Sequence, residues 1–193
     1  FIEAYRIPTE VMKPSLWPGD LIFVSKQAYG IRLPWSQKKV TDGRTPQYGD
    51  IVIYAPHDEP SRNYIKRVVG LPGDRIEIKS GRMILNGQAL EFLPDENQTC
   101  GYEKHPHYEY KICLSPPLMM DIAEQTVPDG SIFVIGDYRS REASRKSGEL
   151  ILKESLRARA LWVWLSINAE QKDAPSQGWL PQFRFDRMFQ SIQ

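Results

Sequence analysis

Fifteen prolines and thirteen glycines are spread along the 193 residues of this chain, and they limit its fold more than any other feature. Proline lacks a backbone N–H and disrupts a helix interior, and glycine favours turns, so their spread indicates many short strands rather than long helices. Between them lie short apolar runs of strand length, rich in β-branched and aromatic residues. These runs cover residues 21–24, 51–54, 131–135 and 157–167. The pattern predicts a mostly β fold.

Composition and charge argue against two classes of protein. A hydrophobic content of 41% is enough for a core, and 25% charged residues argue against a membrane-embedded chain. The net charge is +1 with basic and acidic residues interspersed, so nothing indicates a nucleic-acid partner. A membrane helix needs about 20 apolar residues, and the best run, residues 160–167, is far shorter. The length fits one domain of ordinary size, or one that carries an insertion.

Residues 7–20, IPTEVMKPSLWPGD, connect two strand-like runs and are rich in turn residues. Pro8 and Pro14 exclude a helix interior and fit a loop or a sheet edge. We expect residues 9–12 to form an extended edge between the two prolines. An edge with free backbone groups can take up a peptide as an added strand, so this stretch is a candidate binding site.

At these residues the chain resembles type I signal peptidases, also called leader peptidases. That family has a serine-methionine-x-proline-threonine/serine-leucine run followed by glycine-aspartate. The matching residues here are Met12, Lys13, Pro14, Ser15, Leu16, Gly19 and Asp20. Residues 64–74 match the family's lysine-arginine-valine-x-glycine-x-proline-glycine-aspartate run, with Lys66 in the place of the general base. The resemblance covers roughly residues 1–167 and implies a signal-peptidase-like antiparallel β-sheet core with a smaller inserted subdomain.

Val11 stands where the family has its nucleophilic serine. An isopropyl group has no proton to give up and no lone pair with which to attack, so the family's reacting atom is missing. By resemblance, the oxyanion donors are the Val11 backbone N–H and the Thr9 hydroxyl. Five residues are expected to bind the substrate. Glu10 lies on the peptide-binding edge, and four residues map onto the family's pocket for small side chains: Met12, Leu16, Tyr64 and Ile65. Ordinary core packing would also explain these four.

Lys66 could act as a general base only if its amine is neutral at working pH. A free lysine has a pKa near 10.4, so neutrality requires burial among apolar neighbours. Tyr64, Ile65, Val68 and Val69 could provide that burial, and strand alternation puts Lys66 on the same face as Tyr64 and Val68. The alternative is an ordinary strand lysine whose ammonium group reaches solvent.

A third stretch, residues 136–148, matches only part of the family's glycine-aspartate-x-arginine block that ends in aspartate-serine-arginine. The agreeing residues are Gly136, Asp137, Arg139, Ser144, Arg145 and Gly148. By resemblance, Asp137, Arg139 and Arg145 are structural. Ala143 replaces the aspartate and the block is one residue short, so Ser140 is only the nearest hydroxyl that could orient the lysine. The changed block favours a naturally diverged relative over a point mutant.

Cys100 and Cys113 leave two possibilities open: a disulfide in an oxidising compartment, or two unpaired thiols in the cytosol. The resemblance favours the disulfide, because the family works outside the cytoplasmic membrane. His105 and His107 lie between the cysteines, but the spacing fits no standard zinc pattern. We therefore expect no metal and no other cofactor.

The resemblance also predicts a division of the chain. Residues 1–88 and 127–167 form the β core, residues 89–126 an inserted loop-rich subdomain, and residues 168–193 a linker with a possible short helix after Pro181. The helix would bury Phe183, Phe185, Met188, Phe189 and Ile192 on one side. The chain begins at Phe1, and the family carries a membrane anchor upstream. The expected location is the periplasmic face of the cell membrane.

Three functions follow from these patterns. The first is a serine/lysine endopeptidase scaffold for signal-peptide removal, which binds extended signal-peptide segments of exported proteins but is catalytically inactive because of Val11. The second is a non-catalytic envelope protein for peptide binding or assembly, derived from that family. The third is a working hydrolase whose nucleophile has moved to Thr9 or Ser15.

Overall fold

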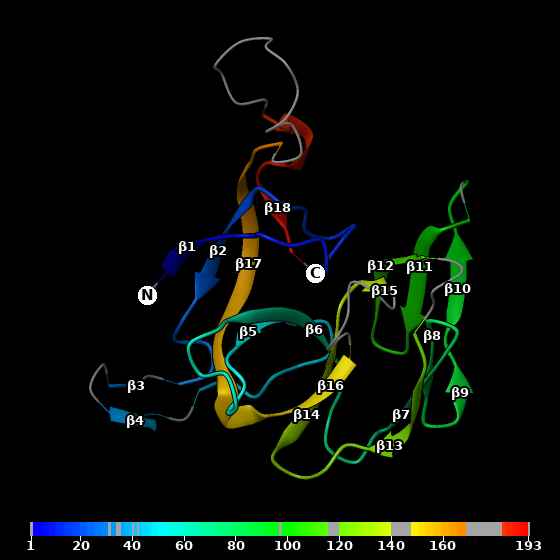
Figure 1. Ribbon diagram of the computed structural model, residues 1–193, viewed down its shortest axis with the longest axis horizontal. Helices are drawn as coiled ribbons and strands as arrows, with labels where there is room; N and C mark the ends of the chain where they lie inside the picture. Colours follow the sequence, from blue (N-terminus) through cyan, green and yellow to red (C-terminus); the bar gives the residue numbers. More distant parts are fainter. Residues whose placement is uncertain are drawn as a thin grey trace.

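Strands dominate the structure, which confirms the mostly β prediction (Figure 1). The computed structural model describes residues 2–30, 32–33, 36–39, 41, 43–96, 98–115, 120–139, 148–168 and 183–192. Its helical elements within these ranges are two 3-10 turns, η1 (Lys153–Ser155) and η3 (Phe185–Arg187).

The largest sheet has eight strands, in the order β1-β2-β17-β5-β6-β14-β16, with β18 paired to β17. The long strand β17 pairs with β5 near its start and with β2 along the rest, and all pairs are antiparallel. Figure 1 shows β17 running through the middle of this sheet. The strands are β1 (Ile2–Arg6), β2 (Asp20–Ser25), β5 (Ile51–Tyr54), β6 (Tyr64–Gly70), β14 (Ser131–Ile135), β16 (Gly148–Leu152), β17 (Leu156–Ser166) and β18 (Gln190–Ser191).

Three smaller sheets complete the fold. One has the order β10-β11-β12-β15, another β13-β7-β8-β9, and the third is the pair β3-β4. The strands are β3 (Arg32–Leu33), β4 (Ser36–Lys39), β7 (Arg75–Lys79), β8 (Arg82–Leu85), β9 (Gln88–Ala89), β10 (Glu91–Pro94), β11 (Cys100–His105), β12 (Tyr108–Leu114), β13 (Ile122–Thr126) and β15 (Tyr138–Arg139). In Figure 1, strands β10–β12 lie on the side of the molecule away from the N-terminus.

Strand alternation sends neighbouring residues of the large sheet into different apolar clusters. On β5, Ile51 and Ile53 join one cluster, while Val52 and Tyr54 join another. We call the first the motif cluster: Ile7, Met12, Leu16, Ile22, Val24, Ile51, Ile53, Ile65, Ala158, Ala160 and Val163. The second is the opposite cluster: Tyr29, Val52, Tyr54, Val68, Ile132, Val134, Ile151 and Leu156. Both faces of β5 are buried, which explains its uninterrupted apolar sequence.

The sequence-based description of residues 89–126 as loop-rich is wrong, because β10, β11, β12 and β13 run through this segment. Tyr110, Ile112 and Leu114 alternate toward a core cluster along β12, and the polar residues between them obscured that pattern. The division of the chain into a core and an inserted subdomain stays a prediction.

The expected C-terminal helix is also replaced, by the single turn η3 and the two-residue strand β18. Phe185 and Phe189 are 76% and 80% exposed, so two of the five apolar residues contribute little packing, while Ile192 packs against the motif cluster. A short helix without such packing is marginal in water. The expected linker falls almost entirely on residues 169–182, outside the described residues.

The disulfide prediction is confirmed. Cys100 and Cys113 lie directly opposite each other on β11 and β12, and their sulfur atoms are bonded. No helix among the described residues is long and apolar enough to cross a membrane.

Candidate active site

Residues 7–20 form a closed, turn-rich loop rather than the expected extended edge. The Ile7 N–H donates to the Asp20 carbonyl at 2.8 Å, and the Gly19 N–H donates to the Ile7 carbonyl at 2.9 Å. Within the loop, the Leu16 N–H donates to the Met12 carbonyl at 2.8 Å. Proline restricts only its own φ and its neighbours, so local hydrogen bonds between the prolines decide the conformation. The strand at one end of the large sheet is β1, which comes just before this loop in the sequence.

Val11 belongs to this loop and lies against Gly136 and Tyr138 of the third family-like stretch. Its side chain packs against the motif cluster, and its carbonyl accepts a hydrogen bond from the Tyr138 N–H at 3.1 Å. A Cβ placed on Gly136 would lie 2.6 Å from the Val11 carbonyl oxygen and 2.8 Å from its Cγ2. The close approach requires glycine at position 136, and it brings the first and third stretches into contact.

The candidate pocket residues divide between the two faces of the large sheet. Met12, Leu16 and Ile65 are buried together in the motif cluster, beside Val11. Tyr64 packs instead against the opposite cluster. Thr9 and Glu10 are exposed, and the Glu10 carboxylate pairs with Lys13 at 2.8 Å. The structure therefore brings together three of the four pocket candidates.

The Lys66 amine lies 2.9 Å from the Glu149 carboxylate. The lysine side chain is only 3% exposed, and the same carboxylate oxygen accepts a 2.5 Å hydrogen bond from the Tyr54 hydroxyl. Burial first, and then the Glu149 carboxylate, raise the pKa of Tyr54 well above its usual value, so the phenol stays protonated. Sequence reasoning missed Glu149, because it lies 83 residues beyond Lys66.

Asp137 anchors the loop through a buried ion pair. Its two carboxylate oxygens accept hydrogen bonds from Arg67 at 2.8 Å each, and both side chains are fully buried. The Ser15 hydroxyl donates to Asp137 at 2.5 Å and accepts from Arg67 at 3.1 Å. Ser15 is thus bound to charged partners.

A second buried ion pair joins Arg139 to Glu103, at 2.6 and 2.9 Å. The Tyr110 hydroxyl also donates to Glu103, and Arg139 donates to the Gly81 carbonyl at 2.9 Å. Ser140 and Arg145 lie outside the described residues, so their assigned roles stay predictions.

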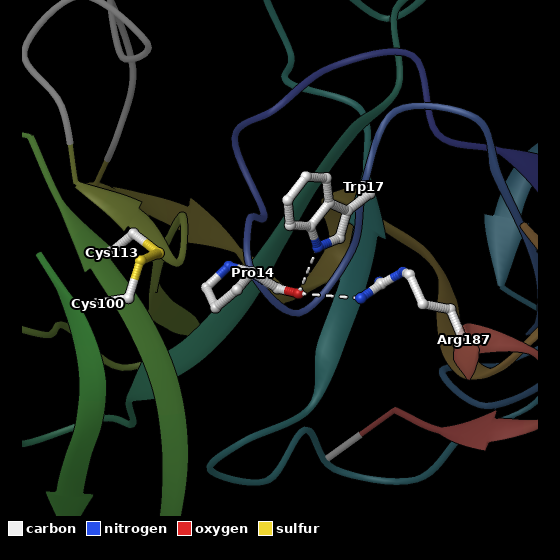
Figure 2. The surroundings of a disulfide bond; sticks show 5 residues. All are labelled: Pro14, Trp17, Cys100, Cys113 and Arg187. Carbon is white, nitrogen blue, oxygen red and sulfur yellow. Dashed lines mark hydrogen bonds between the residues drawn. A yellow bond between two sulfur atoms is a disulfide. The ribbon is translucent and has the colours of Figure 1, made fainter. Parts of the chain in front are cut away.

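Two arginines of the C-terminal segment hold the loop, and sequence reasoning missed both. Arg187 donates to the Ser15 carbonyl at 3.0 Å, to the Asp20 carboxylate at 2.8 Å and to the Pro14 carbonyl at 3.5 Å. Figure 2 shows the Pro14 carbonyl between the Trp17 indole and the Arg187 guanidinium, with the disulfide drawn nearby. Arg184 donates to the Pro18 carbonyl at 2.7 Å. No local pattern in the sequence signals these contacts.

Replacing Arg187 with alanine is expected to lower the free energy of unfolding by about 2 kcal/mol, because hydrogen bonds to a charged group are lost. Chemical denaturation measures this change, and amide exchange at Leu16 and Trp17 should become faster. The control is Arg62→Ala, which removes an exposed partner of Glu59 and should cost less than about 1 kcal/mol. Equal effects of the two substitutions would show that Arg187 does not hold the loop.

Comparison with known proteins gives consistent results. The sequence profile described as "Signal peptidase, peptidase S26" matches residues 1–165. Signal peptidase I of Pseudomonas fluorescens is 35% identical over 185 residues, covering 86% of this chain and 65% of the relative. Signal peptidase I of Pseudomonas aeruginosa is 40% identical over 148 residues, covering 72% of this chain and 52% of the relative. The chain thus spans less than two thirds of the length of both relatives.

Among solved structures, a signal peptidase I from Enterococcus faecalis matches with a TM-score of 0.40 and 20% identity, covering 60% of this chain and 97% of that one. That likeness is too weak to carry an argument, whereas the profile match spans most of the sequence. The chain belongs to the signal peptidase family, peptidase S26.

Proposed function

We propose that this chain binds signal-peptide-like segments of exported proteins and does not cleave them. The proposal is supported by Val11, which by resemblance stands where the family has its serine nucleophile. The family reaction needs a hydroxyl that attacks the scissile carbonyl while a lysine takes its proton. With valine there, only binding and oxyanion contacts remain, and these give a small residual rate.

The binding part of the proposal is supported by β1, which ends the large sheet as far as the structure describes it. Met12, Leu16 and Ile65, which by resemblance correspond to the family's pocket, are buried beside Val11. An extended peptide could add to β1 as a further strand. By kinship, the partners are signal-peptide-bearing proteins, and the site faces the periplasm from an anchor upstream of Phe1.

The test is a paired measurement of binding and cleavage with a fluorescent signal-peptide substrate. We expect saturable binding and no cleavage above the uncatalysed rate. The matched control peptide carries bulky residues in place of the small ones beside the cut, and we expect it to bind at least about tenfold more weakly. Cleavage at a normal enzymatic rate would overturn the proposal, and so would equal binding of the two peptides.

A relocated nucleophile is the less favoured alternative. The Ser15 hydroxyl donates to the Asp137 carboxylate and accepts from Arg67, so it is fixed by structural partners. Thr9 is exposed, on the loop surface. A serine-directed covalent probe should therefore leave both residues unlabelled, and labelling of either would favour a working hydrolase.

A further inference from the structure

We propose that Glu149 keeps Lys66 in its ammonium form, so that this chain lacks the general base of its family as well as the nucleophile. The inference adds a second reason for the proposed absence of cleavage. Its activity test can be interpreted only if the proposed function holds. Its first test, on the protonation of Lys66, needs no peptide.

Strand register brings the three participating side chains to one face of the large sheet. Val134 on β14 pairs with Val68 on one side and with Glu149 on the other. Lys66 is two residues from Val68 and pairs with Val52, and Tyr54 follows on β5. Directly paired residues and residues two apart point to the same face. Glu149, Lys66 and Tyr54 therefore share the side that carries the opposite cluster.

The contacts identify Glu149 as a carboxylate and Lys66 as its cation. One Glu149 oxygen accepts hydrogen bonds from both the Lys66 amine, at 2.9 Å, and the Tyr54 hydroxyl, at 2.5 Å. An opposite charge at this distance favours the charged form of a lysine, whereas apolar burial alone favours the neutral form. The lysine side chain is 3% exposed, so the carboxylate acts on the amine with little screening by water.

The titratable groups that face Lys66 within the described residues are Tyr54 on β5, Tyr64 on β6 and Glu149 on β16. The two tyrosine rings stack 5.8 Å apart, and the Tyr64 hydroxyl donates to Glu59. Both phenols are neutral at working pH, so the charge that acts on Lys66 among these groups is that of Glu149.

The consequence is that a restored hydroxyl at position 11 is not sufficient for cleavage. The introduced hydroxyl must pass its proton to the amine as its oxygen bonds to the scissile carbonyl carbon. That proton then goes to the leaving amine when the peptide C–N bond breaks. An ammonium group cannot accept the first proton. Glu149 is thus a positioning residue that acts through Lys66.

The first measurement follows the ¹⁵N chemical shift of the Lys66 amine against pH, assigned with a Lys66→Met variant. The unaltered protein should show an ammonium group from roughly pH 6 to 9. In Glu149→Gln, the titration midpoint should fall, because an opposite charge within hydrogen-bond distance of the amine is removed. A neutral amine at pH 7 in the unaltered protein overturns the proposal, even if the variant fails to fold.

The second measurement is cleavage of the signal-peptide substrate by the Val11→Ser protein. Its rate should stay near the uncatalysed one, because an ammonium group accepts no proton. Full activity of Val11→Ser alone overturns the role of Glu149. A failure of peptide binding leaves the ¹⁵N result intact and counts only against the proposed function.

Discussion

Replacing Asp137 with asparagine is expected to lower the free energy of unfolding by roughly 3 to 5 kcal/mol, the range for breaking a buried ion pair. Asp137 and Arg67 are both fully buried and joined by two 2.8 Å hydrogen bonds. Asparagine keeps the shape but removes the charge, so the Arg67 guanidinium stays buried without its counter-ion. The Ser15 hydroxyl also loses a charged acceptor. Urea denaturation of the two proteins measures the difference.

The control is Glu91→Gln, the same chemical change at a surface pair. Glu91 lies 3.1 Å from Lys104, with side chains 59% and 39% exposed. Exposed pairs contribute between about 0 and 1 kcal/mol, because water and salt screen them. If the two substitutions destabilise the protein equally, the buried pair does not hold the loop to β6.

Removing the disulfide, by Cys100→Ser with Cys113→Ser, is expected to lower the free energy of unfolding by about 3 kcal/mol. The two cysteines are 13 residues apart in sequence, and closing a loop of this size restricts the unfolded chain by about that amount. The Cys113 N–H also donates to the Asp137 carbonyl at 2.9 Å, so the sheet of β11 and β12 adjoins the third family-like stretch. Thermal and urea unfolding measure the loss.

Reductant supplies the matching control for the disulfide. It should destabilise the unaltered protein by a similar amount and leave the doubly substituted protein unchanged. A loss below about 1 kcal/mol in both experiments would mean that native pairing of β11 with β12 already restricts the unfolded chain.

Local sequence patterns predicted the strands because strands depend on neighbouring residues, whereas the disulfide was predicted from the family resemblance. Apolar runs bounded by glycine and proline became β2, β5, β14 and β17. The loop of residues 7–20 was recognised by its order of residues, but its conformation was not, since hydrogen bonds such as Leu16 to Met12 arise only in the folded turn. The predicted terminal helix failed because Phe183, Phe185 and Phe189 remain exposed, which leaves too little packing for a short helix.

The charged partners of the site could not be predicted, because strand order places them. Glu149 reaches Lys66 only because β14 lies between β6 and β16. Arg187 reaches Asp20 across 167 positions of sequence. Neither residue belongs to a motif or a periodic pattern, so only the three-dimensional arrangement identifies them.

The C-terminal segment extends the folding unit beyond the part of the chain that the family profile matches. The family profile ends at residue 165, yet Arg184 and Arg187 bind the loop that contains Val11. A fragment that ends with the profile match would retain almost all of β17 but leave the buried Asp20 carboxylate without its guanidinium partner. We therefore expect an intact loop to need the chain through residue 187.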